Sequence, residues 1–298
     1  MQTDDGRRNA VVVVNHGSHA LLGRYLAPLA ADLDALVVVV DNSSSPADRE
    51  AAREVAARAG WHLVATPNDG FGAGVNTGAD AAVALGCDVL LVLNPDLTMA
   101  AGTARALLDD VRADPGTVLS PRIVRPDGTT WFAGGTVDLV RGRTSTRPAD
   151  RVEWLSGAGF AVATSAWTQV GGFDDAFFLY WEDVDLSVRL VRAGRRLVVR
   201  DDLVAVHDVG GTQEHAGTRR KSDLYYRHNC RSRLVFAARH LARRDQLRWV
   251  LGAPGFAWEV LLRGGRRQLL HSPRPVLAAA RGTLEGALFV LRHGRRPA

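Results

Sequence analysis

Cysteine is scarce in this sequence: Cys87 and Cys230 are the only two among 298 residues, and they lie 143 positions apart. Such a pair excludes a disulfide-rich scaffold and a cysteine-rich zinc module, and it fits a reducing compartment. The sequence also lacks an uncharged apolar run of the ~18 residues that a membrane span needs. The best candidate, Trp249–Leu262, is too short and contains Pro254 and Glu259. No apolar segment of signal-peptide length follows the polar N-terminus, so we expect a cytoplasmic protein.

Neither disorder nor a fibrous repeat fits the composition, because 46% of the residues are hydrophobic and 23% are charged. A chain of this length can bury a large core in one domain or in two smaller ones. The net charge of +5 is unevenly distributed: residues 219–298 carry 18 basic and four acidic side chains, whereas residues 1–218 carry 19 basic and 28 acidic ones. A basic C-terminal region on an acidic body predicts a polyanionic partner surface, either a membrane or a nucleic acid.

The N-terminal part alternates β-branched apolar runs with helical patterns. Continuous apolar strands separated by helices of ~12 residues predict an α/β fold, in which a Rossmann-like, mostly parallel sheet has helices on both faces. Short loops at the carboxyl ends of the strands then lie where open α/β sheets bind ligands. The expected strands are residues 11–14, 36–40, 61–65 and 89–93, and the expected helices are residues 21–33, 46–59, 100–111 and an alanine-rich stretch that ends at residue 85.

The pattern changes after Pro115, where turn signals predict hairpins, followed by one more helix and one more strand. From about Lys221 the sequence predicts helices to its end, interrupted by proline and glycine at residues 254, 264–265 and 273–275. The hairpin turns are expected at residues 126–128 and 134–135, the helix at residues 183–193 and the strand at residues 197–206.

Polar residues follow the second expected strand, beginning with Asp41-Asn42-Ser43-Ser44. An aspartate at the tip of a parallel strand can accept hydrogen bonds from a ribose hydroxyl or a base N–H. Asp41 can equally cap the next helix, because Asp, Asn and Ser are good N-cap residues. The sequence leaves both interpretations open.

A glycine-rich segment at residues 68–78 follows the third expected strand. Its glycines allow backbone N–H groups to approach a phosphate at a helix N-terminus. The spacing of Gly72, Gly74 and Gly78 differs from the dinucleotide-binding fingerprint, which also follows the first strand of its fold. The alternative interpretation is a tight turn with close helix packing.

Asn94-Pro95-Asp96 directly follows the fourth expected strand. Mg²⁺ and Mn²⁺ prefer carboxylate and phosphate oxygens, so Asp96 is a candidate metal ligand. A proline-fixed turn in which Asp96 caps a helix is the alternative. His207 ends a later strand and precedes glycines, which suits binding of metal or phosphate, although a lone histidine is more often structural.

Three acids, Glu182, Asp183 and Asp185, cluster at the start of an expected helix, next to Tyr180 and Trp181. Negative charge is favourable at the positive end of a helix, and this explains any one of the acids. Three carboxylates beside two aromatic rings are more than capping needs. They suit a general base next to a ring-stacking platform.

Taken in order, these motifs resemble the inverting family 2 glycosyltransferases of the GT-A fold. Within that family the resemblance is to the bacterial rhamnosyltransferase-like enzymes of cell-wall and surface polysaccharide biosynthesis. It covers roughly residues 10–235, and its strength lies in the ordered set rather than in any single motif. The set comprises Val11–Asn15, Asp41-Asn42-Ser43-Ser44, Asn68-x-Gly70-Phe71-Gly72-x-Gly74-x-Asn76-x-Gly78, Asn94-Pro95-Asp96, Gly157-Ala158-Gly159, Gly171-Gly172-Phe173-Asp174, Glu182-Asp183-x-Asp185 and His207.

The resemblance implies a donor site for a nucleoside-diphosphate sugar, linked to dTDP or UDP, and an acceptor site for a glycan or a lipid-linked hydroxyl. Asp183 matches the family's proposed catalytic base, and Glu182 would orient the acceptor. Asp96 stands where the family's DxD motif places its metal-binding acid, with His207 as a further ligand of Mg²⁺ or Mn²⁺. Because the element here is Asn-Pro-Asp, only one carboxylate can chelate directly. The other nucleotide contacts would be Asn15, Asp41, Asn68, Gly70, Phe71, Asn76 and Asn94, and the acceptor contacts would be Trp154, Gly157, Gly159 and Trp181.

The resemblance divides the chain into a GT-A catalytic domain, residues 1–220, and a basic helical extension, residues 221–298. Within the domain, residues 10–115 would bind the nucleotide and residues 116–220 the acceptor. Interleaved arginine and apolar residues in the extension fit helices that lie peripherally on the anionic inner face of the plasma membrane, near a lipid-linked acceptor. The alternative is that these helices pack on the acidic body or form a homodimer contact.

Two other function classes compete. An NAD(P)-dependent oxidoreductase would use the glycine segment as its cofactor loop and Asp96 as its ribose acid, but the fingerprint spacing is wrong and the carboxylate cluster has no role. A non-catalytic nucleic-acid-binding protein would explain the basic C-terminal region. Acids at the strand tips would repel phosphate, however, and no recognised binding motif is present, so we expect no nucleic-acid partner. The donor sugar, the base and the acceptor stay open.

Overall fold

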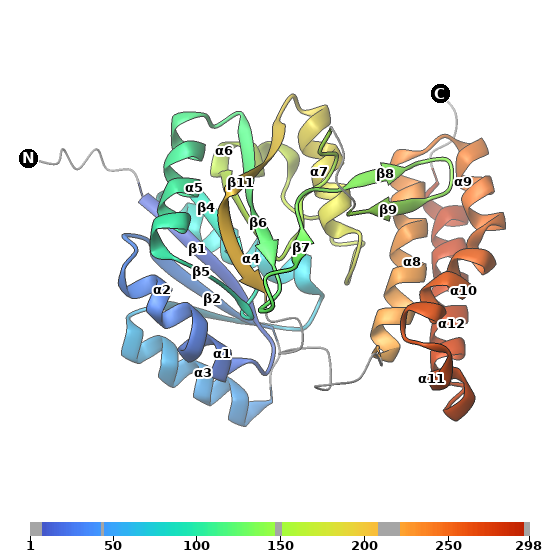
Figure 1. Ribbon diagram of the computed structural model, residues 1–298, viewed down its shortest axis with the longest axis horizontal. Coiled ribbons are helices and arrows are strands. Elements are labelled where there is room, and N and C mark those ends of the chain that lie inside the picture. Colours follow the sequence, from blue (N-terminus) through green and yellow to red (C-terminus); the bar gives the residue numbers. More distant parts are fainter. Residues whose placement is uncertain (1–7, 43–44, 147–150, 208–220, 295–298) are drawn as a thin grey trace, which may run out of the picture.

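The computed structural model describes residues 8–42, 45–146, 151–207 and 221–294 (Figure 1). It consists of a sheet-bearing body (residues 8–207) and a group of C-terminal helices (residues 221–294). The strands of the body are β1 (Arg8–Asn15), β2 (Leu36–Asn42), β3 (His62–Thr66), β4 (Cys87–Leu93), β5 (Leu97–Met99), β6 (Thr117–Val124), β7 (Thr130–Phe132), β8 (Thr136–Asp138), β9 (Arg143–Ser145), β10 (Gly159–Ala163) and β11 (Arg196–His207).

Within the described residues, nine strands form one sheet in the order β3-β2-β1-β4-β10-β6-β11-β5, with β7 paired to β6. The first four strands of this order are parallel, as are β6 and β11. β10 lies antiparallel between β4 and β6, and β8 and β9 form a separate hairpin. The mostly parallel sheet that the sequence predicts is therefore confirmed.

Helices cover both faces of this sheet, as predicted. One face carries α1, η1, α2, α3 and α5, and Arg105 of α5 donates to the Asp32 carbonyl next to α2 at 2.8 Å. The other face carries α4, α6 and α7, and here the rings of Phe160, Trp167 and Phe173 pack together. The helices of the body are α1 (His19–Leu21), the π-helix η1 (Leu22–Leu26), α2 (Ala27–Ala31), α3 (Pro46–Ala59), α4 (Phe71–Ala84), α5 (Ala101–Ala113), α6 (Thr164–Val170) and α7 (Glu182–Arg192).

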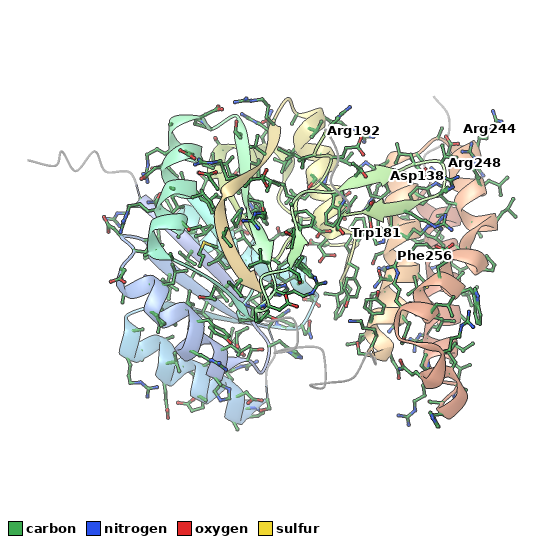
Figure 2. The ribbon with its side chains drawn as sticks, viewed as in Figure 1. Asp138, Trp181, Arg192, Arg244, Arg248 and Phe256 are labelled. Atoms are coloured by element: carbon green, nitrogen blue, oxygen red, sulfur yellow. The ribbon has the colours of Figure 1, made fainter. Side chains whose placement is uncertain are left out.

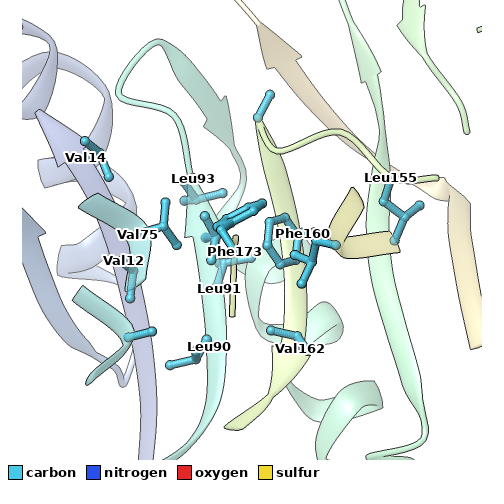
Figure 3. Packing of buried hydrophobic residues seen from close by; sticks show 14 of the residues in the cluster. Val12, Val14, Val75, Leu90, Leu91, Leu93, Leu155, Phe160, Val162 and Phe173 are labelled. Atoms are coloured by element: carbon cyan, nitrogen blue, oxygen red, sulfur yellow. The ribbon is translucent and has the colours of Figure 1, made fainter. Parts of the chain in front are cut away.

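The glycine-rich segment brings α4 close to the sheet. β1 is buried on both sides between β2 and β4, which explains its unbroken run of β-branched residues. A Cβ on Gly78 would lie 2.5 Å from Cγ1 of Val12, and one on Gly74 would lie 3.0 Å from Cγ1 of Val14. Figure 3 shows Val75 of α4 beside these two valines. Close helix packing, one of the two interpretations of this segment, is thus observed.

The sequence patterns do not predict β10 or α6. The β10 segment is a five-residue apolar run, which by itself fits a buried strand or a piece of helix equally well. Its pairing with β4, from Gly159 opposite Leu93 to Ala163 opposite Val89, decides the matter. α6 has seven residues and ends at Gly171, which adopts a left-handed conformation.

The C-terminal helices follow the predicted pattern and pack against the body through α8 and through contacts of α9 and α10 with the β8–β9 hairpin (Figure 1). The predicted breaks are confirmed, and one more separates α8 from α9. α12 lies against α8 so closely that a Cβ on Gly282 would be 1.9 Å from the Arg227 carbonyl oxygen. Among the described residues, no helix is long and apolar enough to cross a membrane. The bounds are α8 (Asp223–His240), α9 (Arg243–Leu251), α10 (Ala253–Arg263), α11 (Arg266–His271) and α12 (Arg274–His293).

Candidate active site

The carboxyl ends of β1 and β2 bring two buried polar side chains together. Asn15 and Asp41 are in register, both are 0% exposed, and the Asn15 amide donates to Asp41 Oδ1 at 3.2 Å. Arg49 on α3 donates to the other carboxylate oxygen at 2.7 Å. The helix-capping interpretation of Asp41 is wrong, because Ser45 caps α3 by accepting from the Asp48 N–H. Asp41 is instead a charged group at the strand ends whose charge is balanced by Arg49.

The loop before α4 joins the same edge of the sheet. Asn42 Nδ2 donates to Asn68 Oδ1 at 3.2 Å and to the Gly70 carbonyl at 3.0 Å. Gly70 has a φ of +112°, and a Cβ there would lie 2.3 Å from the Phe178 carbonyl oxygen, so the position requires glycine. The Phe71 N–H donates to that same carbonyl at 3.0 Å. Asn68, Gly70 and Phe71 therefore link β2 to the segment that precedes α7.

Asn76 lies apart from these strand-end groups. Its amide donates to the Phe173 carbonyl at 2.9 Å, and its oxygen accepts the Phe173 N–H at 2.8 Å. Gly172 has a φ of +64°, and a Cβ there would lie 2.4 Å from Asn76 Oδ1. The side chain thereby fixes the turn at residues 171–173 against α4.

Asp96 and His207 form a buried pair. Asp96 follows β4 and His207 ends β11; they are 4% and 6% exposed, and Oδ1 lies 3.0 Å from Nε2. The ring of Trp131 packs edge-on against the imidazole, with 4.6 Å between centroids. Nδ1 of His207 is buried and has no hydrogen-bond partner among the described residues.

This pair fits a divalent cation. Adjacent ligands of an octahedral ion with bonds of about 2.1 Å lie about 3.0 Å apart, which matches the spacing of the Asp96 oxygen and the His207 nitrogen. A carboxylate and an imidazole suit Mn²⁺, and the carboxylate suits Mg²⁺. No group of three or more His, Cys, Asp or Glu side chains in the described residues could hold a metal ion, so phosphate oxygens of a substrate would have to complete the coordination.

Asp183 begins α7 with its carboxylate held by two backbone donors. Oδ2 accepts the Gly157 N–H at 3.2 Å, and Oδ1 accepts the Val184 N–H at 2.8 Å. Burial raises the pKa of Asp183 to about 6, although these two N–H groups favour its ionised form. An aspartate poised near neutral pH suits general-base catalysis.

Glu182 is the more deeply buried neighbour, at 6% exposure. Burial, and then the nearby charges of Asp183 and Asp185, hold the pKa of Glu182 well above its usual range. Its Oε2 has no hydrogen-bond partner among the described residues. Burial therefore favours the protonated form of Glu182, and its Oε2 is a buried polar atom beside Asp183.

The loop at residues 157–159 connects Asp183 with the turn that carries Asp96. Gly157 donates to Asp183, and the next residue, Ala158, accepts the Asn94 N–H at 2.9 Å. Ala158 and Gly157 are both buried, and Gly159 opens β10 beside β4. Two acids that lie 87 positions apart in the chain are therefore held by one short loop.

Asp185, the third acid of the cluster, points away from this loop. It is 1% exposed, and its oxygens accept from Arg189 Nε at 2.8 Å and from His240 Nε2 at 2.6 Å. Arg192 donates to the other ring nitrogen of His240 at 2.8 Å. Asp185 is thus a neutralised group that joins α7 to α8.

Tyr180 and Trp181 have φ values of +63° and +69°, which are unusual for residues other than glycine. Such a conformation costs about 1–3 kcal/mol per residue and persists where the surrounding structure imposes it. Trp181 is 5% exposed and lies between the body and the C-terminal helices, against Phe236 and Trp249 (Figure 2). Trp154 is 8% exposed and packs on Phe132. The structure thus buries both tryptophans that the resemblance assigns to the acceptor side.

Three residues that contact the candidate site residues are not predicted from the sequence. Arg49 lies on the first turn of α3, so its position four residues after the Ser45 cap is a usable signal for its contact with Asp41. Trp131 falls in an expected hairpin, but nothing in the sequence pairs it with His207. His240 follows Asp185 by 55 positions and carries no local signal.

Solved structures share this architecture. TarS of S. aureus, residues 1–349 in complex with UDP, matches with a TM-score of 0.52 and 16% identity over 97% of this chain and 92% of that one. GalNAc-T7, crystallised with UDP, GalNAc and Mn²⁺, matches with a TM-score of 0.54 and 16% identity over 68% of this chain and 44% of that one. The sheet order and the acids at its strand ends define the class: this is a GT-A fold.

The sequence comparisons identify the family. The model for glycosyl transferase family 2 matches residues 10–180, and that for glycosyl transferase family group 2 matches residues 118–291. The chain belongs to glycosyl transferase family 2. The N-acetylglucosaminyl-diphospho-decaprenol L-rhamnosyltransferase of Mycobacterium tuberculosis is 31% identical over 276 residues, which cover 81% of this chain and 88% of that protein. The resemblance to rhamnosyltransferase-like enzymes is confirmed, and a glycosyltransferase replaces the oxidoreductase and nucleic-acid-binding alternatives.

Proposed function

We propose that this chain is an inverting glycosyltransferase that transfers rhamnose from a dTDP- or UDP-linked donor to a hydroxyl of a lipid-linked glycan. The observation that carries the proposal is the loop at residues 157–159, which holds Asp183 next to the turn of Asp96. The M. tuberculosis relative, named for transfer of L-rhamnose to a diphospho-decaprenol-linked sugar, supports the choice of sugar and acceptor.

The donor nucleoside would bind at the ends of β1 and β2. Asp41 and Asn15 are buried there with their polar atoms paired, and Asn68 stands beside them on the loop before α4. A carboxylate can accept hydrogen bonds from a ribose hydroxyl or a base N–H. The diphosphate would then extend along the strand ends toward Asn94 and Asp96.

Asp96 and His207 would hold Mg²⁺ or Mn²⁺ against the donor diphosphate. When bound, the cation would neutralise the negative charge that grows on the leaving diphosphate. His207 would supply its Nε2, which lies 3.0 Å from the Asp96 carboxylate oxygen, as the second protein ligand.

Asp183 would act as the general base. It would take the proton of the acceptor hydroxyl while that oxygen attacks the anomeric carbon from the face opposite the diphosphate. The bond from the anomeric carbon to the diphosphate oxygen breaks in the same displacement, so the configuration at that carbon inverts. Glu182 would hydrogen-bond the acceptor and help orient it.

A transfer assay tests this function. With dTDP-linked or UDP-linked rhamnose, Mn²⁺ and a polyprenyl-diphospho-N-acetylglucosamine acceptor, we expect a rhamnosylated lipid whose new linkage has the anomeric configuration opposite to that of the donor. Mass spectrometry detects the product, and NMR assigns the anomer. Retention of configuration, or transfer of other sugars only, would contradict the proposal.

The metal assignment predicts a change in nucleotide affinity. We expect Mn²⁺ to tighten binding of the nucleoside diphosphate by about tenfold or more, equivalent to about 1.4 kcal/mol, and Asp96→Ala to abolish this gain. Isothermal calorimetry with and without Mn²⁺ measures it. Asp80→Ala, which removes an exposed acid on α4, is the matched control and should behave like the unmodified protein. Identical titrations of the unmodified protein with and without Mn²⁺ would contradict the assignment of Asp96 and His207 as metal ligands.

Residues 221–298 would bring this enzyme to its acceptor by peripheral contact with an anionic membrane. Some of their arginines serve the fold: Arg227 pairs with Glu285, and Arg239 pairs with Asp174 of the body. Arg233, at 2% exposure, donates to backbone carbonyls of the β8–β9 hairpin. These contacts are the ones expected if the helices pack on the body.

A second set of arginines faces outward on α12 together with leucines. The set recurs every three or four residues, so its members share one face of the helix. Leu277, Leu284 and Leu291 are 64%, 61% and 77% exposed, which is unusual for leucines of a closed surface. The acid nearest to this face, Glu285, is paired with Arg227 and Arg281. The members of the set, called the α12 stripe below, are Arg274, Leu277, Arg281, Leu284, Leu288 and Leu291.

The α12 stripe combines apolar area with positive charge, as helices at an anionic membrane surface do. Trp258 on α10, at 55% exposure, adds an aromatic ring of the kind that favours the headgroup region. In Figure 1, α11 lies at the lower end of the group of C-terminal helices, and the carboxyl end of β11 also points toward the lower side of the body. The alternative to membrane contact is that the α12 stripe packs against a second copy of the chain.

A further inference from the structure

Tyr180 and Trp181 connect the loop at residues 174–179 to the helix that begins with Glu182 and Asp183. Among the described residues, these two are the ones that have positive φ without being glycine. Because they directly precede Glu182 and Asp183, their conformation sets the direction in which α7 starts and the place of the Asp183 carboxylate. A turn of this kind needs partners outside itself to hold it.

Those partners come from α8. Ser232 Oγ donates to the Leu179 carbonyl at 2.9 Å, directly before the left-handed pair. Arg231 donates to the Ala176 carbonyl at 2.8 Å, and Arg239 pairs with Asp174 at 2.7 Å. One turn of α8 therefore holds the carbonyls of residues 176 and 179, and Arg239, two turns further along the same helix, holds the side chain of Asp174.

α8 also holds the two ends of the left-handed turn. Phe236 packs against the Trp181 ring at 5.3 Å between centroids, on the entrance to α7. His240 donates to Asp185 at 2.6 Å in the first turn of α7. The His240 side chain is 4% exposed and that of Asp185 is 1% exposed, so water competes little for this contact.

We infer that α8 is part of the catalytic apparatus: Ser232, Phe236 and His240 are positioning residues that hold the 180–181 turn so that Asp183 meets Gly157. The inference rests on the proposed function, in which Asp183 is the general base. It gives the C-terminal helices a role in the chemical step in addition to any contact with a membrane.

α8 supplies its own control. Arg227 pairs with Glu285 of α12 at 2.8 Å and has no contact with residues 174–185 in the described structure. Arg227→Gln should therefore weaken the packing of the C-terminal helices without moving Asp183. Ser232→Ala and His240→Leu remove contacts to the turn, while His240→Gln retains an N–H donor for Asp185.

The test compares these four variants in the transfer assay, with kcat, the KM of each substrate, the pH dependence of kcat and the melting temperature. We expect Ser232→Ala and His240→Leu to lose about tenfold or more in kcat with donor KM within about twofold, because a misplaced base slows the chemical step alone. The pH midpoint of kcat should move in both. His240→Gln should recover most of the loss, and Arg227→Gln should lower the melting temperature and keep kcat.

Two outcomes overturn the inference: unchanged kcat in Ser232→Ala and His240→Leu, or losses that follow the melting temperature equally in all variants, Arg227→Gln included. Asp183→Asn in the same assay separates this inference from the proposed function. If Asp183→Asn is inactive while the α8 variants keep full kcat, only the positioning role fails. If Asp183→Asn keeps its turnover, the base assignment fails first.

Discussion

Replacing Asp183 by Asn should lower turnover by about 10²–10⁴-fold, because general-base assistance is typically worth that much. Nucleotide binding should stay nearly intact, since the Asp41 and Asp96 groups are unchanged and Asn can still accept the Gly157 N–H. Steady-state kinetics with the lipid-linked acceptor and calorimetry with the nucleoside diphosphate measure the two quantities. Turnover within a few-fold of the unmodified enzyme would reject the base assignment.

The same substitution should stabilise the protein at neutral pH. The pKa of Asp183 is raised from 3.8 to about 6 by burial, so the folded state binds this proton more tightly than the unfolded state does. The ionised carboxylate therefore disfavours folding above pH 6, by up to about 3 kcal/mol if the whole shift counts, and by less because the side chain is half-buried. Asn carries no charge and avoids this cost, although its single oxygen can accept only one of the two N–H groups of Gly157 and Val184, which reduces the gain.

The stability gain has a defined pH window. It should be fully present above about pH 6, shrink as the pH falls from about 6 to about 4, and vanish below that, where the carboxyl is protonated in both states. Denaturant unfolding at pH 4, 6 and 8 measures it. Turnover of the unmodified enzyme should rise through the same midpoint near pH 6 as Asp183 loses its proton.

Asp185→Asn is the matched control for stability, since it alters the same residue type two positions along the helix. Asp185 is paired with Arg189 and His240 at 1% exposure, so Asp185→Asn leaves the half-buried guanidinium of Arg189 without its counter-charge and should destabilise by about 2–3 kcal/mol. If Asp183→Asn raises the free energy of unfolding at pH 8 and Asp185→Asn lowers it, the Asp183 carboxylate destabilises the folded protein. A difference in stability between Asp183→Asn and the unmodified protein that is the same at pH 4 and pH 8 would contradict the raised pKa.

The sequence predicts the first half of the fold well, because its strands are buried on both faces and therefore consist of unbroken β-branched runs such as Val11–Val14. It fails at β10, where five residues become a strand through their pairing with β4 and β6. The motif order also predicts that Asp96 and His207 belong to one site, and they lie 3.0 Å apart at the strand ends.

The sequence cannot assign the individual members of the acid cluster. Glu182, Asp183 and Asp185 look alike in one dimension, and their roles separate through partners from elsewhere in the chain: Gly157 for Asp183, and His240 for Asp185. The burial of Trp181 against Phe236 has the same origin. Side chains whose environment is set by distant elements are the part of a site that local patterns do not encode.

Reversing the unpaired charges of α12 should release the protein from anionic membranes. Arg274 and Arg292 are exposed and form no ion pair within the described residues. Each basic residue near an anionic surface contributes about 1 kcal/mol, so Arg274→Glu with Arg292→Glu removes two favourable charges and adds two unfavourable ones. We expect partitioning onto vesicles of phosphatidylglycerol and phosphatidylcholine to fall by about 10²-fold or more.

The apolar part of the α12 stripe should be separable from its charge. Leu277→Ser with Leu284→Ser should weaken binding to anionic and to neutral phosphatidylcholine vesicles alike, whereas added salt should weaken only the binding that depends on arginine. Arg58→Glu with Val83→Ser, on exposed sites of α3 and α4, makes one charge reversal and one apolar-to-polar change on the body and provides the control. Co-sedimentation measures all of these proteins.

The measurement also decides between a bilayer and a second copy of the chain as the occupant of the stripe. If the leucine variant turns a dimer into a monomer in analytical ultracentrifugation while its vesicle binding is unchanged, the stripe is a dimer interface and the membrane proposal fails. Equal binding of the unmodified protein to anionic and neutral vesicles would contradict the electrostatic part of the membrane proposal, because the exposed arginines should bind anionic lipid more strongly. In a third outcome, the arginine variant loses binding to anionic vesicles and still transfers sugar to a water-soluble acceptor. That result would support a role for α12 in bringing the enzyme to an acceptor lipid in the membrane.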